Sequence, residues 1–275
     1  MMWKQKKRKA ALLLTAALCA SLLNGCGGEM TPKKITEQVE ENLTGVTSFS
    51  NRVKMDIKME ELVHYTKVTM DMTMENTMEP KAGHAKGTAE VTMRGVTLTS
   101  GLEIYQVEEG EDSITYSGLD GQWSKEAAQE SQGGIALDSN LFSEIGESAE
   151  EFQLAEESVE VEEKPCYEMY GNVTGQELIG ILGNSMIHGF GLVELPDDSV
   201  VAELDIPVIL DVYQENMLPA RMIVDMTEVL NKLYNSLGET TDVTQYAIEL
   251  SFTEYNAVGD ICVPQEIQDT AKEIE

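Results

Sequence analysis

Residues 53–60 read VKMDIKME, with an apolar side chain at every second position and a charged one between. Successive side chains of a β-strand point to opposite faces, so this alternation predicts a strand with one apolar and one polar face. The same period of two returns in residues 68–74, VTMDMTM, and in residues 89–94, AEVTMR. Turn-forming segments such as residues 79–83 separate these runs. Strands in series joined by short turns predict an antiparallel meander.

Two segments outside the meander have a helical pattern. In residues 32–43 the apolar side chains recur every four positions, and Pro32 suits the first position of a helix. Thr174 and Glu177 have the spacing of a capping box, which predicts a largely apolar helix directly behind them.

Later segments are expected to alternate between loops, strands and helices. Residues 126–157 predict an acidic loop with short helical pieces around residues 140–151. Residues 200–214 predict one long strand, whereas residues 229–237 fit either a short helix or an irregular segment. No linker divides the chain after the N-terminal region, which indicates one α+β domain.

The N-terminal region has the pattern of an export signal. Residues 1–9 are basic without an acid, and the apolar run of residues 10–23 is shorter than the about 20 residues that span a bilayer. The run ends in Leu23-Asn24-Gly25-Cys26, which resembles the lipobox of bacterial lipoproteins. We therefore expect residues 1–25 to be a lipoprotein signal peptide, 26–31 a lipidated spacer that begins at Cys26, and 32–275 a single domain. The mature protein is then lipid-anchored (a palmitate-type modification) on the extracytoplasmic face of the cell membrane.

The net charge of the mature chain limits the classes of partner that it can bind. Five of the 19 basic residues precede Cys26 and all 49 acidic residues follow it, so the mature chain carries 14 basic and 49 acidic residues, a formal net charge of −35. Without a basic stripe, nucleic acid is a poor partner. Anionic membrane surfaces repel such a body, so the lipid on Cys26 is expected to be its main membrane contact.

Motifs of enzymes and metal sites are missing from the sequence. The three histidines, His64, His84 and His188, lack metal-ligand spacing, and neither a nucleophile motif nor a phosphate-binding glycine loop is present. We therefore expect no catalytic residue, no cofactor and no metal, that is, a protein that is not an enzyme. One alternative is copper(I) binding by the thioethers of Met70, Met72 and Met74, which alternate on one strand face. The alternation equally fits a packed core.

Two cysteines remain after Cys26. Cys166 and Cys262 form a disulfide in one interpretation and are free thiols in the other, because sequence does not show whether they approach each other.

Segments 114–123, ITYSGLDGQW, and 250–256, LSFTEYN, together with 261–267, ICVPQEI, resemble the LolA/LolB and LppX/LprG-like lipoprotein fold. The resemblance covers most of residues 30–275 through the order of elements. It implies a curved antiparallel half-barrel with helices over its concave face and an apolar cavity between them. Members of these families carry acyl chains, so the resemblance implies a lipid or other apolar ligand.

The alternation itself suggests which side chains would face such a ligand. Met is flexible and polarizable, and a concave face of Met, Val, Ile and Leu can hold an acyl chain. The candidate ligand-binding residues are Met55, Ile57, Met70, Met72, Val91, Met93, Ile181 and Met186. The alternative is a non-enzymatic interaction or regulatory lipoprotein with a solid core, which would bind a protein or envelope polymer on its outer surface.

Overall fold

The structure is a computed structural model that describes residues 30–61, 64–110, 112–127, 145, 148–190, 192–193 and 195–273, without the side chains of residues 61, 64, 184 and 185. Residues Pro32–Glu275 form one compact unit. In this part of the chain, none of the helices has the length and apolar character needed to cross a membrane.

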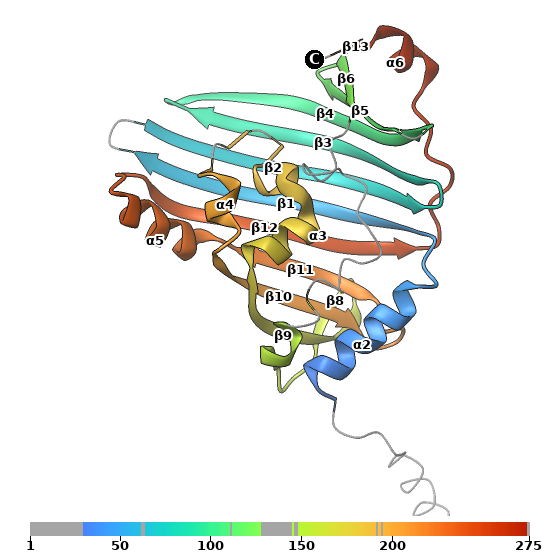
Figure 1. Ribbon diagram of the computed structural model, residues 1–275, viewed down its shortest axis with the longest axis vertical. Coiled ribbons are helices and arrows are strands. Elements are labelled where there is room, and N and C mark those ends of the chain that lie inside the picture. The colour runs from blue at the N-terminus through green and yellow to red at the C-terminus, as the bar shows by residue number, and fades with distance from the viewer. Residues whose placement is uncertain are drawn as a thin grey trace, which may run out of the picture. The chain divides into compact units, whose positions relative to one another are not determined.

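One antiparallel sheet dominates the fold (Figure 1). Its order in the described residues is β13-β6-β5-β4-β3-β2-β1-β12-β11-β10-β9-β7, with β8 paired to β9. Only the β13–β6 pair is parallel among these strands. The strands are β1 Ser48–Glu61, β2 His64–Met78, β3 Lys81–Met93, β4 Val96–Glu109, β5 Asp112–Leu119, β6 Gln122–Ala127, β7 Gln153–Leu154, β8 Val159–Val161, β9 Lys164–Thr174, β10 Asp205–Tyr213, β11 Pro219–Asp225, β12 Asp242–Tyr255 and β13 Lys272–Glu273. The sheet is open and curved, which confirms the predicted α+β half-barrel.

Strands β1 to β6 form the predicted meander of hairpins. The β1–β2 pairing runs from Ser48 with Thr77 to Glu61 with His64 without a register shift. After β6 the chain crosses to the opposite side, where β7 to β11 assemble. Strand β12 then pairs with β11 on one side and with β1 on the other, so the last long strand joins the two halves of the sheet.

The helices are α2 Pro32–Leu43, α3 Gly175–Ile187, α4 Asp198–Val201, α5 Thr227–Leu237 and α6 Gln265–Thr270, with a 3₁₀ turn at Ser148–Glu151. The predicted first helix is confirmed, and its apolar stripe of Ile35, Val39 and Leu43 is buried. The predicted capping box is also present. The Thr174 backbone N–H donates to Glu177 Oε2 (2.6 Å), and the Glu177 N–H donates to Thr174 Oγ1 (3.2 Å).

Residues 200–204 do not belong to a strand, so the prediction of one long strand over residues 200–214 is wrong at its start. Asp197 accepts a hydrogen bond from the Ser199 N–H (2.9 Å) and begins the short helix α4. A local side-chain cap therefore overrides the alternation of apolar residues in this segment. Strand β10 begins only at Asp205. Residues 229–237, for which helix and irregular structure both fitted, belong to the helix α5.

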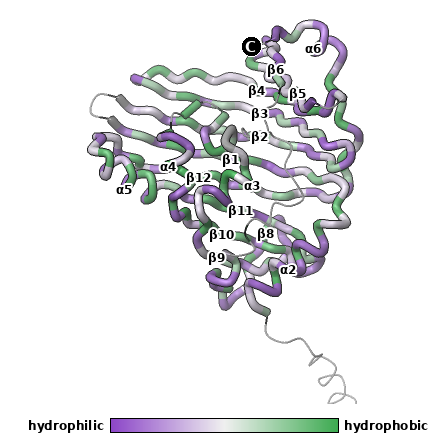
Figure 2. The backbone as a smooth tube through the Cα atoms, viewed as in Figure 1, coloured by the Kyte–Doolittle hydropathy of each residue, from purple (hydrophilic) through white to green (hydrophobic). Residues whose placement is uncertain are grey.

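The main core lies on one face of the sheet, which we call the inner face. It carries the apolar positions of the alternating strands, and Figure 2 shows hydrophobic and hydrophilic residues following one another along these strands. The outer face carries charged and hydroxyl side chains together with two smaller apolar clusters, one around Tyr105 and Tyr116 and one around Cys166 and Tyr213. Helices α3 and α4 cross this inner face (Figure 1). Tyr246 of β12 donates a hydrogen bond from its hydroxyl to the carbonyl oxygen of Ile187, at the end of α3. This contact fixes α3 above the middle of the sheet.

Candidate functional site

The inner face contains one apolar row that runs across five neighbouring strands. Tyr246, Ile57, Val68, Val91 and Leu98 are consecutive cross-strand partners from β12 to β4. Partners in register place their side chains on the same face of a sheet. Tyr246, Ile57 and Val68 are completely buried, Val91 is half-buried, and Leu98 is 66% exposed. The row therefore begins in the core beneath α3 and ends in the open.

Beside this row, β3 presents only small side chains to the inner face. Its inward positions before Val91 are, in order, Gly83, Ala85, Gly87 and Ala89. A Cβ atom on Gly87 would lie 2.1 Å from the carbonyl oxygen of Asp71 and 2.6 Å from the Cα of Met72. Glycine is therefore required here by the close approach of β2. The small side chains of β3 lie between the methionines of β2 and the leucine and isoleucine side chains of β4.

An apolar strip continues the inner face beyond the buried core. It consists of Met93 (52% exposed), Val96 (61%), Leu98 (66%) and Leu119 (53%). Met93 pairs with Val96 at the end of the β3–β4 hairpin, and Leu119 of β5 pairs with Leu102 of β4. Exposed apolar side chains that are neighbours on one face often mark a binding surface.

The structure gathers the eight predicted ligand-binding residues in the region of the inner face. Met55, Ile57, Met70 and Met72 are buried on β1 and β2, and Ile181 and Met186 are buried on α3. Val91 and Met93 lie at the uncovered end of β3. Their role in ligand binding stays a prediction.

Sequence reasoning missed the uncovered residues on the neighbouring strands, Val96, Leu98 and Leu119. Val96 and Leu98 alternate in phase with Leu102, so the period of two could have found them.

Under α3 the inner face is filled by side chains. Leu178, Ile181, Leu182, Met186 and Ile187 are each at most 2% exposed. Gly183 interrupts the helix, with φ 73° and ψ 153°. The buried end of the face is thus a packed core in this structure, and the open end is where an apolar ligand finds uncovered surface.

The methionine side chains of β2 are part of the same core. Met70, Met72 and Met74 are each at most 3% exposed, and the Met74 thioether accepts a hydrogen bond from the Asn51 amide (3.9 Å). Among the described residues, no group of three His, Cys, Asp or Glu side chains is arranged for a metal ion. His84 contacts Glu75 (3.5 Å) and Glu103 (3.0 Å).

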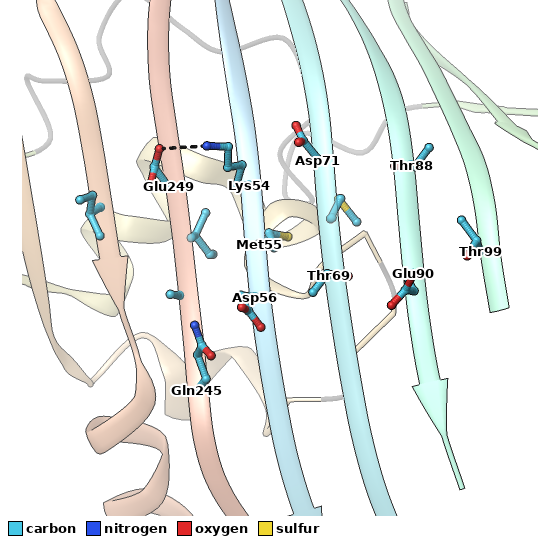
Figure 3. Close-up of a pocket in the computed structure, with 14 residues that line it drawn as sticks. Lys54, Met55, Asp56, Thr69, Asp71, Thr88, Glu90, Thr99, Gln245 and Glu249 are labelled. Carbon is cyan, nitrogen blue, oxygen red and sulfur yellow. Dashed lines mark ion pairs between the residues drawn. The ribbon is translucent and has the colours of Figure 1, made fainter. Parts of the chain in front are cut away.

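Across β11 to β4 the outer face is largely polar and holds an open groove of about 500 Å³, which we call the central groove (Figure 3). Its acidic side chains are largely paired with bases. Arg52 Nε donates to Asp71 Oδ1 (2.6 Å), which lowers the pKa of Asp71, and Lys54 lies 3.7 Å from Glu249. This face therefore differs from the inner face in both polarity and charge balance.

Cys166 and Cys262 are both free thiols. Cys166 is buried in a cluster with Val161, Tyr213 and Ala220, where burial raises the pKa of its thiol to about 11. Cys262 is exposed and lines a different pocket. The free-thiol interpretation is the one that the structure supports.

Comparison with known proteins agrees with this architecture. The model of a family of unknown function, DUF6612, matches residues 31–272. No curated protein matches the chain. The chain is similar to the crystal structure of LprF from Mycobacterium bovis, with a TM-score of 0.50 and 12% identity over 85% of this chain and 96% of that one. The lipoprotein LppX of Mycobacterium tuberculosis aligns with a TM-score of 0.47 and 14% identity over 84% of this chain and 98% of that one. The similarity to LprF thus supports the LppX/LprG-like lipoprotein fold expected from the sequence.

Proposed function

The chain belongs to the DUF6612 family of unknown function, and we propose that it is a lipid-anchored extracytoplasmic protein that binds an acyl chain or other apolar ligand on the inner face of its sheet. The role is one of binding, and no catalytic residue is assigned.

One observation carries the proposal. The row from Tyr246 to Leu98 is apolar at every position, and its exposure rises from zero to 66% across adjacent strands. A solid core would end where its cover ends. Here the apolar surface continues uncovered over Met93, Val96 and Leu98, next to the small side chains of β3.

An extended acyl chain matches this surface in shape and chemistry. Each methylene group that it buries contributes about 0.8 kcal/mol, so a chain needs only part of its length on the strip for micromolar binding. The small inward side chains of β3 lie beside Leu98 and Leu102 of β4, which continue the apolar surface. For the ligand to reach Met55 and Ile57, α3 must shift, and the break at Gly183 provides a place for that movement.

The anchor is inferred from the sequence. Cys26 and the lipobox lie outside the described residues, and α2 begins only six positions later at Pro32. A lipid on Cys26 would hold the domain close to the membrane while the acidic body resists adsorption to anionic lipids.

A titration with palmitate carrying an environment-sensitive fluorophore tests the binding role. The Cys26→Ser variant, delipidated under denaturing conditions and refolded, should bind the probe saturably with micromolar affinity, and unlabelled palmitate should displace it. Absence of saturable binding, in a protein whose circular dichroism shows the folded sheet, would contradict the proposal.

A further inference from the structure

A second groove lies on the outer face near the opposite edge of the sheet, and we call it the edge groove. It has a volume of about 960 Å³, within the range of ligand sites. Strands β9, β10 and β11 form its floor, and the Ser148–Glu151 turn and β7 contribute to its wall. Its floor lies on the outer face, and Glu177 in the first turn of α3 also contributes to its wall.

The floor of the edge groove is apolar. Tyr170, Ile209 and Ile223 are consecutive cross-strand partners on β9, β10 and β11. Tyr170 is 43% exposed, and both isoleucines are half-buried. Pro207 is exposed at the next outward position of β10. An aromatic ring beside two isoleucines offers a platform for an apolar side chain of a partner.

The wall of the edge groove is acidic. Glu151, Glu177, Asp205 and Asp225 line it, and its described lining contains no Lys, Arg or His. None of the four forms an ion pair with a described residue. Asp205 accepts a hydrogen bond from the Asn172 amide (2.9 Å) and Asp225 from the Thr227 N–H (3.0 Å), each through one oxygen. Among the described residues, no hydrogen-bond donor contacts the second oxygen of either carboxylate.

A comparison with the central groove shows that acidic side chains without basic neighbours are a feature of the edge groove. In the central groove, Lys54 and Arg52 lie beside Glu249 and Asp71 and offset their charge. The edge groove has an acidic wall of the same kind without the bases. The two grooves share Ile223, so the contrast exists within one continuous face.

We propose that the edge groove binds a cationic peptide segment of a partner protein, in which Lys or Arg side chains flank an apolar one. The apolar side chain would lie on Tyr170, Ile209 and Ile223, and the flanking cations would meet Asp205 and Asp225. Charge complementarity excludes an anionic ligand. It also disfavours a second copy of this chain, whose mature charge of −35 would be repelled.

The probe is the peptide acetyl-Lys-Leu-Lys-Tyr-Lys-amide, titrated by fluorescence anisotropy against the Cys26→Ser full chain. The peptide should bind, and its affinity should fall as the salt concentration rises. Its counterpart with Glu in place of Lys should not bind. Tyr170→Ser should weaken binding about tenfold through the platform. Asp225→Asn should weaken it about threefold, as expected for a partly exposed ion pair, and should reduce the salt dependence. Glu90→Gln, in the central groove, removes the same charge elsewhere on this face and should leave the affinity unchanged.

Three results would overturn the proposal. Equal losses in Asp225→Asn and Glu90→Gln would mean that the peptide responds only to the general negative charge. Equal binding of the Glu counterpart would remove the charge argument. Binding of the neutral saccharide chitotetraose that depends on Tyr170, without binding of the peptide, would assign the groove to a glycan.

Discussion

Val68 and Leu98 lie in the same apolar row, but the structure predicts that truncating Val68 lowers the stability of the protein and that truncating Leu98 hardly changes it. Val68 is completely buried, so Val68→Ala removes packed methyl groups and should lower the free energy of unfolding by about 2 kcal/mol. Leu98 is 66% exposed, so Leu98→Ser should change that free energy by less than about 0.5 kcal/mol. Stability and ligand binding should thus separate along a single row.

The effect of Leu98→Ser on binding follows from its exposed surface. A chain that covers roughly 50 Å² of this side chain gains about 1.2 kcal/mol from it at 25 cal/mol per Å², so Leu98→Ser should weaken probe binding about sevenfold. Urea unfolding measures the first quantity and fluorescent palmitate titration the second. Thr99→Ser, on the outer face at the next position, is the matched control and should change neither. Unchanged affinity in Leu98→Ser, or an equal loss in Thr99→Ser, would refute the assignment of the strip.

Three further predictions concern the scaffold and the anchor. Asp211 is buried with one oxygen unpartnered among the described residues, and its other oxygen accepts a hydrogen bond from Arg221 Nε (2.7 Å), so Arg221→Met should lower the free energy of unfolding at pH 7 by about 3 kcal/mol. Burial raises the pKa of Asp211, so the folded state favours its protonated form, and the loss in urea unfolding should shrink as the pH falls from 7 towards 4. A loss independent of pH would contradict this cause. Gly87→Ala should lower the unfolding free energy by about 3 kcal/mol, since its Cβ would overlap the backbone of β2 at Met72, and a loss below about 1 kcal/mol would show that the strands separate easily. Cys26→Ser should move the protein from the membrane to the soluble fraction without a change in Tm, and retention on the membrane would reveal a second contact.

The sequence predicted the strands of the meander because their side chains alternate without interruption. In residues 53–60 and 68–74 every second position is apolar, and both runs lie in register with each other in the sheet. The capping box at Thr174 was equally local, since both of its partners lie within one helical turn. Features of this kind depend on neighbours in sequence, and they were predicted correctly.

The sequence could not predict which inward positions of the strands are buried, because their burial depends on segments that are distant in the sequence. Val68 and Leu98 follow the same alternation, yet α3 lies more than 75 positions beyond both and determines where the inner face is filled. The same limit explains residues 200–204, where the cap by Asp197 outweighed an apolar alternation. The apolar floor of the edge groove depends on strands β9, β10 and β11 meeting, which no single run of sequence contains.

Photocrosslinking tests the assignment of the inner face most directly. Palmitate with a diazirine near its methyl end, irradiated with the Cys26→Ser protein and mapped by peptide mass spectrometry, should label inward positions of β3 and β4 such as Met93, Val96 and Leu98. The outward neighbours Thr97 and Thr99 should remain unlabelled, and excess palmitate should suppress the labels. Labels on the outer face, or labels that palmitate does not suppress, would contradict an acyl-binding inner face.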